Sequence, residues 1–120
     1  MLLTRETIIN KLLDWKLNLI SETDINSWAN ALYPSDEVEY NDWEENHSVT
    51  NEVLCYLDNL DMNLGTTDDI PQIILFLKTP LGEFESGYSQ WNIYMKNIDI
   101  EKRQISLIKN PFYAAFCNKR

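Results

Sequence analysis

The sequence predicts a single all-α domain, a compact bundle of five to seven helices spanning residues 1–120. Three observations favour this class. Apolar residues recur along most of the chain at the three- and four-residue spacing of amphipathic helices. The chain has only three glycines and four prolines, fewer turn residues than an all-β sandwich normally uses. Its hydrophobic fraction is 44%, and a chain of this length can bury one core without disulfides or metals.

Two helices are predicted in the N-terminal quarter. Thr4 is the candidate N-cap of the first helix, which runs to about Ile20 and carries a broad apolar face. Ser21 and Asp24 have the spacing of a capping box at the start of the second helix. The second helix is expected to end at Pro34, since proline disfavours helical geometry in the residue before it.

The middle of the chain begins with a polar, acidic stretch. Residues 34–47 form a loop or contain a short helix, and the sequence leaves both open. A strong amphipathic helix is predicted from about Ser48 to Leu64. Gly65 follows at the position where a left-handed residue commonly ends a helix.

The next segment is ambiguous between helix and strand. Thr66 and Asp69 have the spacing of another capping box, and the apolar residues of the helix it would open are Ile70, Ile73, Ile74 and Leu77. A buried strand over 72–78 is the alternative, because short apolar runs fit both. Prolines and glycines within 80–87 predict a connection.

The last third allows two readings. Residues 88–98 suit a helix, and Asp99 is positioned to cap a further one. Alternating apolar residues also fit a hairpin turning near 101–103, so the alternative fold class is α+β with a C-terminal hairpin inside 88–109. Pro111 begins a short final turn. Eight positions are expected in the core: Ile8, Leu12, Trp28, Leu32, Val53, Leu57, Leu60 and Ile74.

The charge balance narrows the class of partner. The chain has 19 acidic and 10 basic residues, a formal net charge of −9. Nucleic acid and anionic membranes would repel such a chain, so neither is expected as a partner. A basic protein would be attracted over long range. The alternative is that the charge serves solubility alone.

Localisation is predicted to be cytoplasmic. Cys55 and Cys117 are far apart and form no CxxC pattern, which is typical of reduced cysteines. Arg5 and Glu6 interrupt the N-terminus before an apolar stretch develops, so no signal peptide is expected. The longest purely apolar run, residues 73–77, is far short of the roughly 20 residues that span a membrane.

No catalytic, cofactor or metal motif is recognised. His47 is the single histidine, and the Glu44-x-x-His47 pair lacks the second such unit that a di-iron site requires. A calcium loop starting at Asn59 would need a glycine and a glutamate where Leu64 and Ile70 stand. Phosphate-binding glycine loops have no match. We therefore expect no enzyme activity and no cofactor.

The segment 36–45 is the candidate binding surface because it combines carboxylates with aromatic residues. Tyrosine and tryptophan are common interface anchors, and carboxylates pair with a partner's arginines and lysines. The alternative is that the aromatic residues pack on the protein's own core while the acids face water. The candidate residues are Asp36, Glu37, Glu39, Tyr40, Asp42, Trp43, Glu44 and Glu45.

Three stretches resemble small acidic bacterial proteins of unassigned function. In size, acidity and aromatic content the chain is also similar to immunity proteins that neutralise bacterial toxins. That second likeness implies a tight complex with a cognate toxin, often a basic nuclease, and assigns no individual residue. The stretches are WANALYPSDEVEYNDWEENHSVTNEVLCYLDNLDMNL (28–64), DDIPQIILFLKTPLGEF (68–84) and ISLIKNPFYAAFC (105–117).

The leading functional hypothesis is a non-catalytic binding protein, with an immunity or inhibitor role against a basic toxin as its most concrete form. One alternative is a small enzyme that uses carboxylates or a divalent metal, which a pocket with converging acids would favour. Another is a structural subunit of a homo-oligomer, which a large apolar interface would reveal.

Overall fold

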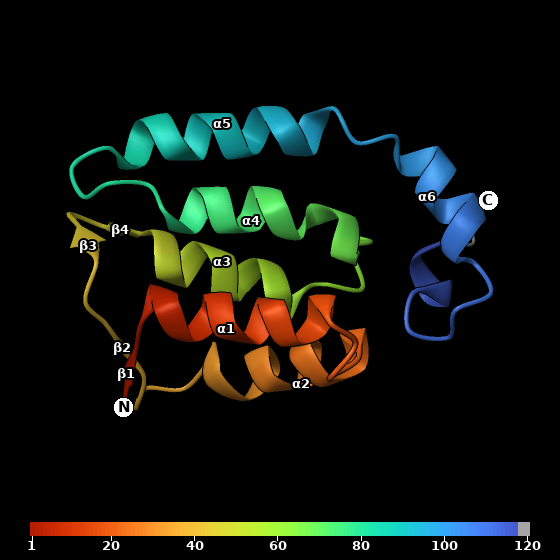
Figure 1. The fold of residues 1–120 in the computed structure, drawn as a ribbon, viewed down its shortest axis with the longest axis horizontal. Coiled ribbons are helices and arrows are strands. Elements are labelled where there is room, and N and C mark those ends of the chain that lie inside the picture. Colours follow the sequence, from red (N-terminus) through yellow and green to blue (C-terminus); the bar gives the residue numbers. More distant parts are fainter. Residues whose placement is uncertain (118–120) are drawn as a thin grey trace.

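Six α-helices dominate residues 1–117, the part of the chain that this computed structural model describes, and they confirm the all-α prediction. Figure 1 shows α1 to α5 lying side by side with their axes roughly aligned, and α6 at one end of the stack. The helices are α1 (Arg5–Lys16), α2 (Glu22–Leu32), α3 (Val49–Asp58), α4 (Ile70–Leu77), α5 (Phe84–Lys96) and α6 (Ile100–Leu107).

The first two helices begin where the sequence predicts. Thr4 caps α1, and its hydroxyl oxygen accepts a hydrogen bond from the Thr7 amide at 3.2 Å. Ser21 and Asp24 form the capping box of α2: the Asp24 amide donates to Ser21 Oγ at 3.1 Å, and the Ser21 amide donates to Asp24 Oδ2 at 2.9 Å. Both caps satisfy backbone N–H groups that a helix start leaves without partners.

Two helices are shorter than predicted, because turns begin before their expected ends, and each run of turns contains a left-handed residue. α1 stops at Lys16 instead of near Ile20, and Asn18 has a φ of 61°. α3 stops at Asp58 instead of Leu64, and Leu64 has a φ of 53°. Asparagine adopts this conformation more readily than most residues, whereas leucine does so only when packing holds it there.

Gly65 has a different role from the predicted one. Leu64, not Gly65, takes the left-handed conformation. A Cβ atom at position 65 would collide with the side chains of Leu60 and Tyr56. Glycine is therefore required here for a close approach of the turn to α3.

The C-terminal half is helical where the sequence left strands open. Residues 70–77 form α4, so the alternative strand is wrong. The hairpin alternative is also wrong, because α5 and α6 occupy that region. Phe84, Tyr88 and Trp91 pack towards the core at helical spacing. Ser86 and Gly87, expected in a connection, belong to α5, and the connection is limited to residues 78–83.

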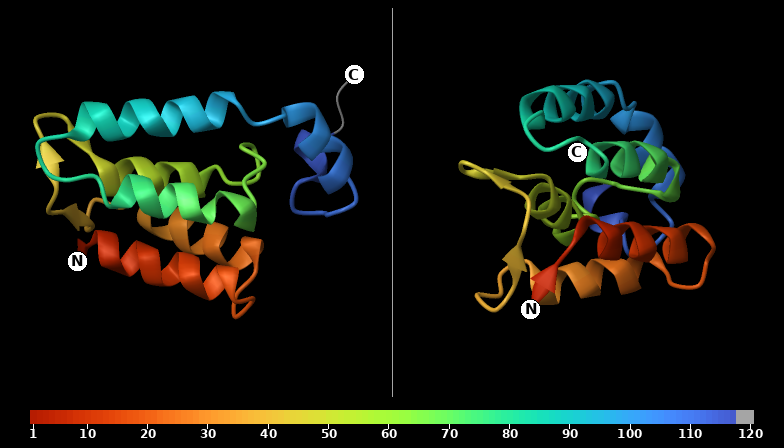
Figure 2. Two further views of the ribbon diagram at one scale, coloured as in Figure 1. Left: turned by 45° about the horizontal axis from the view of Figure 1, so that its top comes forward. Right: turned by 60° about the vertical axis from the view of Figure 1, so that its left-hand side comes forward.

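The core lies where the helices meet. α1 packs against α2, α3 and α4, and α5 covers α4 (Figure 2). The predicted core positions fall into two groups. Five are buried: Ile8, Leu12, Val53, Leu57 and Leu60. Three are partly buried and pack against that core: Trp28, Leu32 and Ile74.

Four strands of two residues each lie at the end of the molecule opposite α6 (Figure 1). β1 (Leu2–Leu3) pairs in parallel with β2 (Glu39–Tyr40). β3 (Trp43–Glu44) and β4 (His47–Ser48) form an antiparallel hairpin. The acidic stretch is therefore built of short strands and turns and contains no α-helix.

Asp69, which is fully buried, joins α6 to the bundle. Its carboxylate accepts two hydrogen bonds from the Arg103 guanidinium, both at 2.7 Å, and one from the Tyr94 hydroxyl at 2.6 Å. Arg103 also donates to the Leu64 carbonyl at 3.0 Å. Burial would raise the pKa of Asp69, but hydrogen bonds from Arg103, Tyr94 and Thr66 outweigh it and hold the pKa below its usual range.

Both cysteines are free thiols: Cys55 is partly exposed, and Cys117 is buried beside Leu64 and Tyr113. Within residues 1–117, every helix is too short or too polar to cross a lipid bilayer.

Candidate protein-interaction surface

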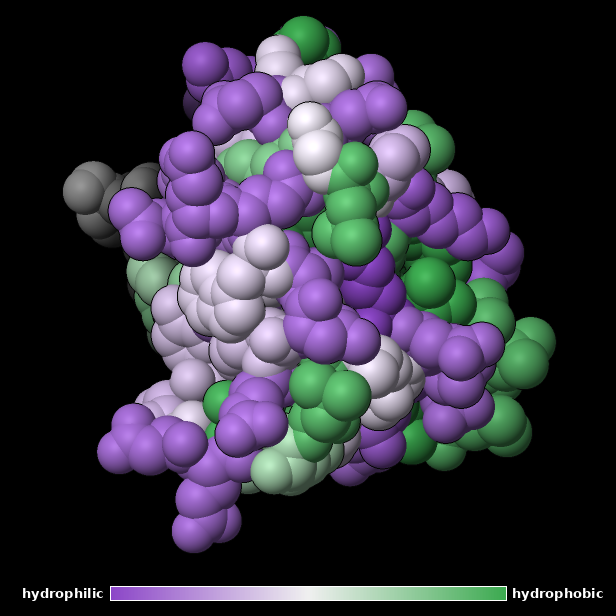
Figure 3. Space-filling model, turned by 90° about the vertical axis from the view of Figure 1, so that its left-hand side faces the viewer, coloured by the Kyte–Doolittle hydropathy of each residue, from purple (hydrophilic) through white to green (hydrophobic). Residues whose placement is uncertain are grey.

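The candidate surface lies at the strand-bearing end of the bundle, between the end of α2 and the start of α3 (Figure 1). Hydrophilic residues cover most of this end, with separate hydrophobic residues between them (Figure 3). We call residues 36–45 the acidic–aromatic segment. Its eight candidate residues turn out to have three different environments.

The first half of the segment is held by the N-terminus of the chain. The Met1 ammonium donates to the Glu37 carbonyl at 2.8 Å, and the Glu39 amide donates to the Met1 carbonyl at 2.8 Å. In β1, Leu3 is fully buried beside Tyr40 of β2. These bonds fix the backbone and leave the side chains of Glu37 and Glu39 in solvent.

The second half is the β3–β4 hairpin, whose two-residue loop is Glu45 and Asn46. Glu45 has a φ of 58°, in the left-handed region that glycine and asparagine occupy most readily. A glutamate there costs about 1–2 kcal/mol relative to its preferred conformations. The hairpin therefore presents a carboxylate at its tip at some expense in stability.

Asp42 is the structural centre of the segment and is not a surface residue. It is only 4% exposed. Its Oδ2 accepts hydrogen bonds from the Thr50 amide at 3.0 Å, the Thr50 hydroxyl at 2.8 Å and Arg5 Nε at 2.9 Å. Its Oδ1 accepts from the Ser48 hydroxyl. The prediction that Asp42 contacts a partner is corrected: its oxygens are already bound inside the protein.

The same network keeps Asp42 ionised. Burial would raise the pKa of its carboxyl group, but hydrogen bonds from Ser48, Arg5 and Thr50 hold the pKa below its usual range. Ser48 is also the N-cap of α3, where its hydroxyl oxygen accepts from the Asn51 amide at 3.0 Å. Asp42 therefore connects the hairpin to the first turn of α3.

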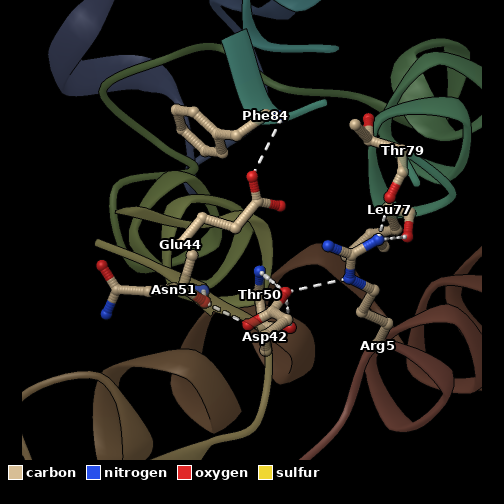
Figure 4. A network of polar contacts seen from close by, with 9 residues as sticks. Arg5, Asp42, Glu44, Thr50, Asn51, Leu77, Thr79 and Phe84 are labelled. Carbon is tan, nitrogen blue, oxygen red and sulfur yellow. Dashed lines mark hydrogen bonds and ion pairs between the residues drawn. The ribbon is translucent and has the colours of Figure 1, made fainter. Parts of the chain in front are cut away.

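Arg5 extends this network to a third helix. It stands at the start of α1, and its Nη1 donates to the Leu77 carbonyl at 3.0 Å and to the Thr79 carbonyl. Figure 4 shows its guanidinium group between the Asp42 carboxylate and these carbonyls at the end of α4. Carbonyls at a helix C-terminus have no helical partner and carry partial negative charge, so a cation is stabilising there.

Glu44 points towards α5. Its Oε1 accepts a hydrogen bond from the Phe84 amide at 3.4 Å, at the positive N-terminus of that helix (Figure 4). His47, across the hairpin from Glu44, stacks on the Phe84 ring with centroids 4.7 Å apart. Glu44 and His47 therefore hold the hairpin against α5.

Trp43 is the aromatic residue that the hairpin exposes, with half of its surface accessible to solvent. Tyr40 is partly buried against the core and meets Trp43 edge to face, with ring centroids 5.8 Å apart. Two exposed leucines that sequence reasoning missed lie beside the segment. Leu2 is in β1 opposite Glu39, and Leu81 lines a shallow cleft of about 300 Å³ together with Asn41 and Asp42.

The structure thus divides the candidate residues. Asp42 and Glu44 organise the segment, and Tyr40 supports it from the core. The residues that face solvent are Asp36, Glu37, Glu39, Trp43 and Glu45. We call these five, together with Leu2 and Leu81, the acidic–aromatic surface.

Sequence reasoning missed the residues that hold this surface in place. Arg5, Ser48 and Thr50 are separated from Asp42 by between six and 37 positions. One signal was present: Ser48 is a good N-cap directly before an amphipathic helix. The partners of a buried carboxylate are chosen by tertiary contacts, and a single sequence does not contain these.

An enzyme site, the alternative to a binding surface, would need a cleft with converging carboxylates or metal ligands. A cleft of about 540 Å³ lies between the α1–α2 connection and the C-terminal turns and contains Glu22 and Asp24. Both carboxylates are engaged: Glu22 accepts from Asn110 at 3.1 Å, and Asp24 from the Ser21 amide. The Ser21 bonds lower the pKa of Asp24, the opposite of what a general acid needs. Within residues 1–117, no group of three metal-ligating side chains converges.

Comparison with family models, with curated proteins and with solved structures gave no match to this chain.

Proposed function

We propose that this chain binds a basic protein through the acidic–aromatic surface and catalyses no reaction. One observation carries the proposal. Trp43 is half exposed on a hairpin that a buried, ionised network fixes to three helices, and the same segment carries exposed carboxylates. An exposed tryptophan on a mobile loop would lose entropy on binding, whereas one on a fixed hairpin loses little.

Trp43 would serve as the central anchor. Tryptophan buries a large area with only two rotatable side-chain bonds, and it is enriched among residues whose truncation costs most in binding. Tyr40 supports one edge of its ring. Leu2, opposite Glu39, and Leu81, in the cleft with Asn41, would add apolar area beside the segment, so a partner would bury a mixed patch with carboxylates at its rim.

The exposed carboxylates would select the partner and speed the encounter. Asp36, Glu37, Glu39 and Glu45 face solvent at the same end of the molecule, and the chain as a whole carries a charge of −9. A field of one sign accelerates association with an oppositely charged protein and weakens as salt screens it.

An immunity or inhibitor role in the cytoplasm is the most concrete form of this proposal. The resemblance to toxin-neutralising proteins supports it at the level of class, and both cysteines being free thiols fits a reducing compartment. The cognate partner would be a basic toxin, and binding would block its active surface.

The experiment that tests this proposal is affinity capture from an extract of the native host. The test variant combines Trp43→Ala with Glu37→Lys and Glu45→Lys. Glu44 is left unchanged, because a lysine there would face the positive N-terminus of α5 and disturb the fold. The control variant, Asp58→Lys with Asp61→Lys, changes the net charge equally at the last residue of α3 and in the turn that follows it.

We expect the wild-type chain and the control to capture the same basic protein in a salt-sensitive manner. The test variant should lose it while keeping the wild-type melting temperature. Equal capture by all three proteins would contradict the assignment of this surface.

A further inference from the structure

A second surface without an assigned role lies on α6, at the end opposite the acidic–aromatic surface (Figure 1). No residue of α6 is buried. Ile105 is 77% exposed, more than any other large hydrophobic residue described. Ile108 is also exposed, as is Phe116, whose backbone carbonyl accepts a hydrogen bond from Gln104 of the helix at 3.3 Å.

The direction of this surface follows from how α6 is attached. Arg103 is bound to the buried Asp69, and Leu107, one turn later, packs against the cluster around Leu64. At about 100° per residue, positions 101, 105 and 108 lie on the opposite face of the helix. Glu101, Ile105 and Ile108 therefore face away from the bundle, and all three are exposed.

We propose that a second copy of this chain docks on this face, with the two α6 helices antiparallel about a two-fold axis through Ile105. In such a pair, two residues that lie equally far from Ile105 along the sequence, one before it and one after it, face each other across the interface. Glu101 of one copy then lies opposite Lys109 of the other, in the turn that directly follows α6, and the axis repeats this pair. Ile105 packs on its own symmetry mate, flanked by Ile108 and Phe116.

The charges on the exposed face of α6 favour a second copy of the chain as its binding partner. Two molecules of charge −9 repel each other, most strongly through their acidic–aromatic surfaces. The α6 face carries both signs, with Glu101, Lys102 and Lys109 exposed around the isoleucines. An antiparallel pair brings Glu101 and Lys109 of opposite copies together twice, while Lys102 forms no pair, so this face is complementary to itself through these two ion pairs.

The size of the face sets the strength of the dimer. A standard protein interface buries about 1,600 Å², and one eight-residue helix with a flanking phenylalanine supplies less. The association is therefore weak and depends on concentration. The dimer leaves the acidic–aromatic surface of each copy free at its outer ends. The proposal of a dimer therefore does not depend on the proposed function.

Sedimentation velocity of the purified full chain, from about 10 µM to about 1 mM, tests the proposal directly. The wild-type protein should shift from monomer towards dimer across this range, and Ile105→Asp should stay monomeric. Glu101→Lys and Lys109→Glu should each weaken the dimer about tenfold, because like charges then face each other twice. The double variant Glu101→Lys with Lys109→Glu restores both ion pairs and should regain an affinity within about threefold of wild type.

Circular dichroism of every variant verifies that α6 remains folded. Restoration by the double variant is the decisive outcome, since a general loss of folding cannot produce it. A wild-type chain that stays monomeric at every concentration would overturn the proposal. An Ile105→Asp variant that dimerises like wild type, or a double variant no better than the single ones, would overturn it equally.

Discussion

Glu45 is held in a conformation that its side chain disfavours, at the tip of the hairpin that exposes Trp43. Strained residues persist where the surrounding structure fixes them, and they cluster at functional sites. Here the strain coincides with an exposed carboxylate in the proposed binding surface. A glycine or asparagine would relieve the strain, but would remove the charge.

Replacing this residue separates stability from binding. Glu45→Gly should raise the free energy of unfolding by about 1 kcal/mol, because glycine adopts the left-handed region without penalty. The same variant should bind the cognate partner more weakly, since the carboxylate is lost. Urea denaturation measures the first effect and calorimetric titration the second. Glu45→Ala removes the charge but keeps the strain, so it should weaken binding without any gain in stability.

Asp42 accounts for much of the stability at this end of the molecule. Asp42→Asn should lower the free energy of unfolding by about 2–4 kcal/mol, because Arg5 then loses its carboxylate partner in a partly buried site. Chemical denaturation measures the loss. Asp36→Asn, an exposed change of the same chemistry in the same segment, should stay within about 0.5 kcal/mol of wild type.

Asp42 and Asp69 also determine how stability responds to acid. Both have a folded-state pKa below the unfolded value, so each contributes stability that is fully present above pH of about 4. That contribution is lost as the pH falls through the lower folded-state pKa, where both carboxylates become protonated. Denaturation between about pH 7 and pH 2 should therefore show a steep loss of stability at the acid end. If the stability of Asp42→Asn fell as steeply with pH as that of the wild-type protein, an ionised Asp42 in the folded state would be contradicted.

At the scale of elements, local signals predicted where helices start better than where they end. The capping boxes at Ser21 and Thr66 are both formed, because each needs only residues within four positions, although the one at Thr66 opens a short 3₁₀ turn, Thr67–Asp69, that leads into α4. The ends of α1 and α3 were placed too late, since apolar residues continue beyond both helices into turns. Asn18 and Leu64 turn the chain there to meet other helices, and periodicity carries no information about that contact.

The sequence pattern alone also does not decide between helix and strand for the residues of α5 and α6. Trp91, Ile93 and Met95 alternate as in a strand, but the structure buries Trp91 and exposes Ile93 as part of a helix packed on α4. One face of α5 is covered and the other is in solvent. Short apolar patterns fit both periods, and only the neighbouring element decides between them.

The close approach of α5 to the end of α4 gives a prediction for this element. A Cβ at Gly87 would collide with the Thr79 side chain, including its Cβ. Gly87→Ala should therefore destabilise the protein by about 1–3 kcal/mol, although alanine has the higher helix propensity. Thermal denaturation checks this. Ser86→Ala, on the exposed side of the same turn, should be neutral or slightly stabilising, and equal behaviour of both variants would argue against the contact.

The attachment of α6 gives a second prediction for an element. Arg103→Met removes the guanidinium from the buried Asp69, and it should weaken the docking of residues 99–117 more than the packing of α3. Hydrogen exchange read by mass spectrometry should show lost protection in α6 and unchanged protection in α3. Lys102→Met is the matched control, because Lys102 is exposed on the same helix. Uniform loss of protection across the chain would show that α6 is no separate unit.

At the scale of the whole molecule, the bundle places two different surfaces at opposite ends of its long axis (Figure 1). One end is acidic with an exposed tryptophan, and the other carries exposed isoleucines among charges of both signs. The separation allows a weakly dimeric protein to present two copies of the acidic–aromatic surface, facing away from each other.

The fold class was predictable from the sequence, and the candidate site only in part. Composition and apolar periodicity depend on local sequence, which is why the helical class and most core positions were correct. The acidic–aromatic segment was located because its composition is unusual. The burial of Asp42 and the inward turn of Glu44 were not foreseen, since Arg5 and Phe84 reach them from distant parts of the chain.

The most direct measurement of the central claim is a hydrogen-exchange footprint of the complex formed with the captured partner. We predict that binding protects residues 37–47 and the N-terminal strand, and that the protection disappears when Trp43→Ala is combined with Glu37→Lys and Glu45→Lys. Protection centred on the cleft around Glu22, with the hairpin unchanged, would contradict the account.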